Sequence, residues 1–171
     1  YGISEAERDV KDVLESEKNL VVDLGCGTGT LTEMLYEKGY DMIGVDNSDS
    51  MLAVAMNKKS ISGSEILYLL QDMREFELYG TVRAVYSACD SINYILEEED
   101  LRKVFSLVNN YLDPKGIFIF DVNTPEKLRA MDGQVWLDED EDVFCVWRGE
   151  FDEETNICSY GMDLFQRQGK V

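Results

Sequence analysis

The sequence predicts an α/β fold, with a central, mostly parallel sheet flanked by helices and a C-terminal antiparallel β hairpin or accessory β-lobe. Between residues 20 and 120, short apolar runs alternate with segments whose apolar residues recur at helical spacing. Residues 143–151 and 157–165 are instead rich in aromatic and branched residues, and a polar loop separates them. The first pattern is typical of a parallel sheet, and the second of a hairpin.

The chain is predicted to begin with an amphipathic helix that ends near Glu17. Ile3, Val10 and Leu14 are among the apolar residues that recur there at helical spacing, with charged residues between them. We expect this helix to pack beside the first strand.

The stretch from Asp23 to Gly29 organises the rest of the chain. A buried strand over 20–24 leads into the alternate glycines Gly25, Gly27 and Gly29, and a helix begins near Thr30. Without a Cβ, the glycine backbone can turn tightly and a ligand can lie directly against it. The carboxylate of Asp23 can orient this loop or face a cationic ligand.

The helices that follow the first two strands are amphipathic. Gly39 ends the first helix, and Asn47 or Ser48 caps the second. The residues on their apolar faces are Leu31, Met34 and Leu35 in the first helix, and Met51, Leu52, Ala55 and Met56 in the second.

Asp46 ends the second strand, 41–45, and follows Gly25 by the spacing of about 20 residues that is typical of a nucleotide-binding βαβ unit. An acidic residue at that point can accept hydrogen bonds from both ribose hydroxyls. We predict that Asp46 binds ribose, and the alternative is an aspartate that only caps the next helix or turn.

Three more strands are predicted, over 66–70, 82–87 and 117–120. The helix 98–112 and the turn 113–116 precede the last of them, which shows almost no alternation and is therefore expected to be covered on both faces. Loops after such strands face the crevice where ligands bind.

The run Asp-Leu-Gly-Cys-Gly-Thr-Gly at 23–29 resembles motif I of the class I S-adenosylmethionine-dependent methyltransferases, of the small bacterial type. The resemblance covers residues from about 18 to 131 and includes the Asp-Pro-Lys-Gly turn at 113–116. It implies a Rossmann-like fold that binds S-adenosylmethionine, releases S-adenosylhomocysteine and uses no metal.

The resemblance also assigns roles to individual residues. The glycine loop and Asp23 would hold the methionine portion, and Met51 would lie against the adenine unless it is a core residue. Asp72 would accept the adenine amino group, or is an ordinary solvated loop carboxylate. The expected cofactor-binding residues are Asp23, Gly25, Cys26, Gly27, Gly29, Asp46, Asn47, Met51, Asp72, Met73 and Cys89.

Asp90 and Tyr94 are the candidate catalytic residues, because the segment after the fourth strand is expected near the donated methyl group. Either could remove a proton from the acceptor. Two alternatives stay open: Asp90 serves only to cap the turn that follows, or the acceptor is already deprotonated and needs no base. The segment lacks the Asn-Pro-Pro-Tyr type of sequence found in amino-group nucleic-acid methyltransferases.

Two domains are predicted: an S-adenosylmethionine-binding core at 1–132 and an antiparallel β segment at 133–171. The β segment would complete the seven-stranded sheet of the class or form an accessory lobe over the substrate. In the second case the chain would stop before its sheet is complete. The acidic run 138–142 fails the calcium-loop pattern, since Val143 and Gly149 stand where an EF-hand has glycine and glutamate.

Composition excludes several classes of function. The net charge of −19 repels phosphate backbones, so a nucleic-acid partner is disfavoured. The 171 residues contain no histidine, which excludes Ser-His-Asp chemistry and histidine-ligated metal sites within them. Four scattered cysteines and the lack of a long apolar run or a signal sequence suggest a soluble, cytoplasmic protein without a membrane anchor.

The predicted function is methyl transfer from S-adenosylmethionine to a small molecule or, less readily, to a protein. One alternative is an NAD(P)-dependent oxidoreductase, which the missing third glycine at Thr30 opposes. Another is a non-catalytic S-adenosylmethionine-binding protein. The sequence does not identify the acceptor or the oligomeric state.

Overall fold

A computed structural model describes residues 20–169, and the predicted N-terminal helix lies outside them. The chain divides into two compact units, one ending at Val122 and the other beginning at Asn123. The boundary predicted after residue 132 is a functional one, between the cofactor-binding core and the antiparallel β segment. It stays a prediction.

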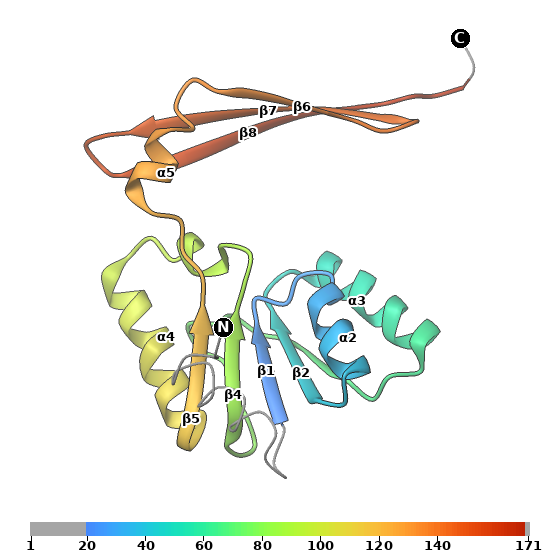
Figure 1. Cartoon of the computed structure of the whole chain (residues 1–171), viewed down its shortest axis with the longest axis vertical. Helices are drawn as coiled ribbons and strands as arrows, with labels where there is room; N and C mark the ends of the chain where they lie inside the picture. Colours follow the sequence, from blue (N-terminus) through green and yellow to red (C-terminus); the bar gives the residue numbers. More distant parts are fainter. Residues whose placement is uncertain (1–19, 170–171) are drawn as a thin grey trace, which may run out of the picture. The chain divides into compact units, whose positions relative to one another are not determined.

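The first unit contains a five-stranded sheet in which every pair of neighbouring strands is parallel. The strands are β1 (Leu20–Leu24), β2 (Asp41–Asp46), β3 (Leu67–Leu70), β4 (Val82–Ser87) and β5 (Leu112–Phe120). Their order is β3-β2-β1-β4-β5, and Figure 1 shows β5, β4, β1 and β2 side by side. The order reverses between β1 and β4, which is where parallel α/β sheets bind ligands.

The helices of the first unit occupy the connections between these strands. They are α2 (Thr30–Glu37), α3 (Asp49–Ser62), the 3-10 helix η1 (Ser91–Tyr94) and α4 (Glu98–Tyr111). The Ser48 side chain caps α3 by accepting a hydrogen bond from the Met51 amide, and Gly63 ends α3 in a left-handed conformation. These local signals explain why α3 begins and ends where it does.

Hydrophobic side chains cover both faces of the sheet. On one face, Val22, Leu24, Val45 and Val85 form a buried cluster with Phe76 of the loop after β3 and Val104 and Val108 of α4. On the other face, Val21, Met42, Ala84 and Tyr86 pack with Leu35 and Tyr36 of α2. The sheet is therefore the middle layer of the first unit.

The prediction that the last parallel strand is covered on both faces holds for its middle, where Phe118 packs against one core cluster and Ile117 against the other, but not for its carboxyl end. Ile119 and Phe120, at the carboxyl end of β5, are both partly exposed. The main chain of β5 also bulges between Leu112 and Ile117, and Lys115 adopts a left-handed conformation there. The predicted turn at 113–116 is thus an irregularity at the start of the strand.

The apolar face of α2 is also less buried than its spacing suggests. Leu31 is 39% exposed and Met34 is 51% exposed, whereas Thr32 and Glu33 are buried. The two buried polar side chains have hydrogen-bond partners, so their burial is compensated. Polar anchoring as well as hydrophobic contact holds α2 on the sheet.

The second unit contains a short helix and a separate antiparallel sheet. Its elements are α5 (Pro125–Arg129), β6 (Val135–Glu139), β7 (Val143–Asp152) and β8 (Ile157–Gln166). The predicted hairpin is β7 and β8, which lie along one another in Figure 1. The sequence missed β6, which pairs with β7 and makes a sheet of three strands distinct from the parallel one.

Within residues 20–169, no helix combines the length and apolar character that a membrane crossing requires.

Candidate functional site

The three glycines of the loop between β1 and α2 all have left-handed backbone conformations. Their φ values are +86° at Gly25, +54° at Gly27 and +70° at Gly29. A side chain would be strained at each position. The loop therefore requires glycine for its backbone, independently of any ligand.

Space around the three glycines differs sharply. A Cβ on Gly25 would lie 2.7 Å from Ser91 Oγ, and one on Gly29 would lie 2.4 Å from the Tyr68 hydroxyl. A Cβ on Gly27 would meet no atom within 4 Å. Gly25 and Gly29 are therefore packed against the protein itself, whereas Gly27 faces open space that a ligand can enter.

Most amides of the loop donate hydrogen bonds within the protein. The amides of Gly25 and Cys26 both donate to the Val45 carbonyl, at 2.8 and 3.0 Å, and the Gly29 amide donates to Cys26. These bonds hold the loop against the end of β2. A ligand that approaches the loop would meet the glycine α-carbons and the first turn of α2.

Asp46 connects the loop to the end of β2. Its Oδ2 accepts a hydrogen bond from the Gly27 amide at 2.7 Å, and its Oδ1 accepts one from the Ser48 amide at 2.8 Å. A carboxylate has about four acceptor positions, so both oxygens retain capacity for hydroxyl donors. Asp46, the residue predicted to bind ribose, thus lies beside Gly27, the glycine that faces open space.

Asp23 points away from the loop, towards α2. Its side chain is 3% exposed, and its Oδ2 accepts a hydrogen bond from the Thr32 hydroxyl at 2.6 Å. Burial raises the pKa of Asp23 to about 6, and the hydrogen bond from Thr32 opposes this shift. Of the two roles that the sequence left open, this geometry favours orientation of the loop and helix.

Cys26 and Tyr68 pack beneath the loop. Burial, reinforced by Asp23 and Asp46, raises the pKa of the Cys26 thiol well above its usual range, so the thiol stays protonated. The ring of Tyr68 lies against Gly44 of β2, where an added Cβ would come within 2.6 Å. Sequence reasoning missed Tyr68, although a glycine inside a strand signals such close packing.

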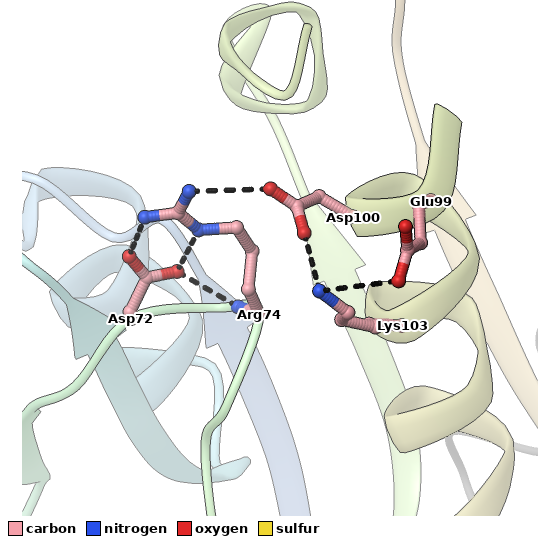
Figure 2. A network of polar contacts seen from close by, with 5 residues as sticks. All are labelled: Asp72, Arg74, Glu99, Asp100 and Lys103. Atoms are coloured by element: carbon pink, nitrogen blue, oxygen red, sulfur yellow. Dashed lines mark hydrogen bonds and ion pairs between the residues drawn. The ribbon is translucent and has the colours of Figure 1, made fainter. Parts of the chain in front are cut away.

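Asp72 follows β3 and is held by Arg74, as Figure 2 shows. Arg74 Nε donates to Asp72 Oδ1 at 2.9 Å, and Nη2 donates to Oδ2 at 2.5 Å. This ion pair lowers the pKa of Asp72, and the nearby Asn47 side chain lowers it further. Asp72 is therefore neither isolated nor simply solvated.

Two consecutive residues after β4 have left-handed backbones without being glycine. Their φ values are +59° at Cys89 and +64° at Asp90. Such conformations cost about 1–3 kcal/mol each and are common at functional sites. The Asp90 amide donates to Asp121 Oδ2 at 3.2 Å, so the loop after β4 is joined to the end of β5.

For Asp90, the alternative to a catalytic role was that it only caps the turn that follows, and the structure supports this in position but not in hydrogen bonding. Asp90 stands at the start of η1, but its side chain makes no capping hydrogen bond. Ser91, which sequence reasoning missed, instead packs against Gly25 and donates to the Ala88 carbonyl at 2.8 Å. Tyr94 is 78% exposed.

The structure brings most of the predicted site residues together. Met73 Cε lies 3.4 Å from where a Gly25 Cβ would stand, which places the loop after β3 beside the glycine loop. Asp46, Asn47 and Asp72 lie at the adjacent ends of β2 and β3. Met51, in the first turn of α3, is 46% exposed.

A hollow lies along the sheet rather than at the glycine loop. It measures about 530 Å³ and is lined mainly by apolar side chains of β1, α2, β4 and β5, including Leu31, Leu35 and Ile119. Cys89 and Asp121 belong to its lining, but Asp46 and Asp72 do not. Among the apolar residues of α2, Leu31 and Leu35 line the hollow, which accounts for the exposure of Leu31 but not for that of Met34.

Comparison with known proteins places the chain in a methyltransferase family. Residues 21–116 match the family described as "Methyltransferase domain". The chain is 36% identical over 157 residues to a putative methyltransferase, YqeM, of Bacillus subtilis (strain 168). That alignment covers 91% of this chain and 63% of the relative, so the chain spans less than two thirds of that protein's length.

Solved structures show the same fold. An S-adenosylmethionine-dependent methyltransferase from Clostridium acetobutylicum ATCC 824 superposes with a TM-score of 0.82 and 32% identity, over 95% of this chain and 67% of that one. The sugar N-methyltransferase KedS8 from Streptoalloteichus sp. ATCC 53650 has a TM-score of 0.70 at 22% identity, over 95% and 72% of the two chains.

Proposed function

Because this chain belongs to the class I S-adenosylmethionine-dependent methyltransferases, we propose that it binds S-adenosylmethionine at the ends of β1, β2 and β3 and methylates a small molecule. The observation that carries the proposal is the contact between Asp46 and the Gly27 amide. It joins a ribose-binding carboxylate to the one loop glycine whose surroundings are open.

The residues at this edge of the sheet suit the proposed cofactor. The open face of Gly27 admits close approach, Asp46 retains acceptor capacity for two ribose hydroxyls, and Asp72 is available to the adenine amino group. Asp23 lies behind the loop and fixes α2 through Thr32, so its negative charge acts on a cationic ligand from a distance. Carboxylates around a sulfonium cation are electrostatically favourable.

The chain needs to supply little more than alignment. S-adenosylmethionine supplies a methyl group that is already activated on a sulfonium. The loop and Asp46 would hold the donor, and the segment from Cys89 to Tyr94 would face the acceptor. Asp90 and Tyr94 are the residues of that segment that could accept a proton from the acceptor.

A small-molecule acceptor is supported by the charge of the protein. With a net charge of −19, its surface opposes binding of nucleic acid. The sugar N-methyltransferase with the same fold acts on a small molecule, as its name states. The four cysteines are free, which supports the predicted cytoplasmic location.

Calorimetry tests the cofactor. We expect the purified protein to bind S-adenosylhomocysteine and to show no binding of NADH at the same concentration. Binding of NADH without binding of S-adenosylhomocysteine would refute the proposal and revive the oxidoreductase alternative.

A labelling experiment tests the activity. Cell extract incubated with the protein and methyl-labelled S-adenosylmethionine should yield a labelled product in the small-molecule fraction. Label in protein would overturn the acceptor class, whereas cofactor binding without any labelled product would favour the non-catalytic alternative.

A further inference from the structure

We propose that Arg74 is the positioning residue that makes the cofactor site selective for adenine over hypoxanthine, by fixing the orientation of the Asp72 carboxylate. The inference rests on the proposed function, in which Asp72 faces the nucleoside base. It adds a residue to which the sequence assigned no role.

Three donors of Arg74 fix Asp72. Oδ1 accepts from the Arg74 amide at 2.8 Å and from Nε at 2.9 Å, while Oδ2 accepts from Nη2 at 2.5 Å. The pairing of a planar guanidinium with both carboxylate oxygens determines the plane of the carboxylate as well as its position. A lysine could neutralise Asp72 but could not impose this plane.

Arg74 is itself held from the opposite side (Figure 2). Its Nη1 lies 3.4 Å from Asp100 Oδ2, at the start of α4, and Asp100 Oδ1 accepts from Lys103 Nζ at 2.7 Å. Glu99 Oε1 lies 4.0 Å from the same Nζ. This alternation of charges links the loop after β3 to α4.

The arrangement determines which base the carboxylate can accept. From Arg74, Oδ1 accepts two hydrogen bonds and Oδ2 accepts one, and the Asn47 side chain also hydrogen-bonds the carboxylate. The amino group of adenine is a donor that can take over the acceptor position used by Asn47, while Arg74 keeps the carboxylate in place. The carbonyl oxygen of hypoxanthine at the same position would face an ionised carboxylate and gain no hydrogen bond, which penalises its binding.

The test compares two ligands that differ at the C6 substituent and at the adjacent N1, which is an acceptor in adenine and carries a proton in hypoxanthine. Calorimetry would give the dissociation constants of S-adenosylhomocysteine and S-inosylhomocysteine for the unaltered protein and for Arg74→Ala, Arg74→Lys and Arg102→Ala. Arg102 is the matched control, because it pairs with Glu98 on the surface of α4 and its loss removes the same charge. Circular dichroism would show that each variant is folded.

We expect the unaltered protein to prefer the adenine ligand by on the order of a hundredfold, because the inosine ligand sets its carbonyl oxygen against an ionised carboxylate instead of donating to it. Arg74→Ala should reduce that preference about tenfold, Arg74→Lys should restore little of it, and Arg102→Ala should leave it unchanged. A purely structural role would weaken both ligands equally and keep their ratio.

An unchanged ratio in Arg74→Ala would overturn the inference while leaving the proposed function intact. Tighter binding of both ligands by Arg74→Ala would also overturn the inference. It would show that, in the unaltered protein, Arg74 competes with the ligand for the Asp72 carboxylate. If the unaltered protein binds neither ligand, the proposed function fails and the inference fails with it.

Discussion

Asp46 shows how one side chain can serve both the fold and a ligand. Its two oxygens accept hydrogen bonds from the amides of Gly27 and Ser48, which belong to the segments on either side of β2's end. The same carboxylate is the predicted ribose ligand. Substitution of Asp46 should therefore weaken cofactor binding more than the partial burial of its side chain would suggest.

Asp46→Ala should weaken binding of S-adenosylhomocysteine by at least about tenfold, because it removes two charged hydrogen bonds worth about 1.5–3 kcal/mol each. Calorimetry measures the loss. Asp41→Ala is the matched control, since Asp41 is exposed at the opposite end of the same strand. An unaltered dissociation constant for Asp46→Ala would show that the ribose is held elsewhere.

Asp23 should make the stability of the protein depend on pH. Its folded-state pKa, about 6, lies above the ordinary value of 3.8, so its contribution to stability is complete below 3.8 and is lost as pH rises through 6. Asp23→Asn removes this titration while keeping the shape of the side chain.

Relative to Asp23→Asn, the unaltered protein should lose about 1–2 kcal/mol of unfolding free energy between pH 5 and pH 8. Urea denaturation of both proteins at the two pH values gives the difference. A constant difference across this range would mean that Asp23 titrates normally in the folded protein.

At the scale of the elements, different glycines of the glycine loop have different roles: one packs against the protein, and another leaves room for a ligand. Gly29 adjoins Tyr68 and Ala55, whereas Gly27 adjoins open space. The two positions share left-handed backbones, so alanine is strained at both. They therefore form a natural pair for comparing the two roles.

Gly27→Ala should cost about 1–2 kcal/mol of stability from backbone strain and should greatly weaken cofactor binding. Gly29→Ala should cost more, by about a further 1–3 kcal/mol, because its methyl group overlaps the Tyr68 hydroxyl. Urea unfolding and calorimetry together measure both effects. Equal destabilisation by the two substitutions would contradict the packing role of Gly29.

The predictability of the elements follows from how local their causes are. The β1 loop and Asp46 were predictable, because glycine spacing and the distance to the next acidic residue are local signals. β6 was not, since its acidic residues suggest a connector and the strand forms through pairing with β7. The ion pair between Arg74 and Asp72 was also missed, because it depends on side-chain orientation.

At the scale of the whole molecule, the feature that bears on stability is the net charge. A net charge of −19 destabilises the compact state through self-repulsion, and the described ion pairs, such as Arg102 with Glu98, lie largely on the surface. Screening should weaken the repulsion across the whole molecule more than it weakens these few attractions.

Raising NaCl from about 20 mM to about 500 mM, which shortens the screening length several-fold, should therefore increase the urea concentration at the unfolding midpoint. An uncharged osmolyte at equal osmolality controls for non-electrostatic stabilisation. A midpoint that falls with salt would indicate that the ion pairs outweigh the general repulsion.

The contact of Ser91 with Gly25 constrains how this site could be engineered. The Ser91 hydroxyl lies where a side chain on Gly25 would stand, so the segment that would face the acceptor and the loop that would hold the donor are fitted to each other. A mutant library designed to accept new substrates by varying residues 89–94 would need to retain Ser91. Otherwise, variants chosen for a new substrate would also have an altered glycine loop and would bind the methyl donor less tightly.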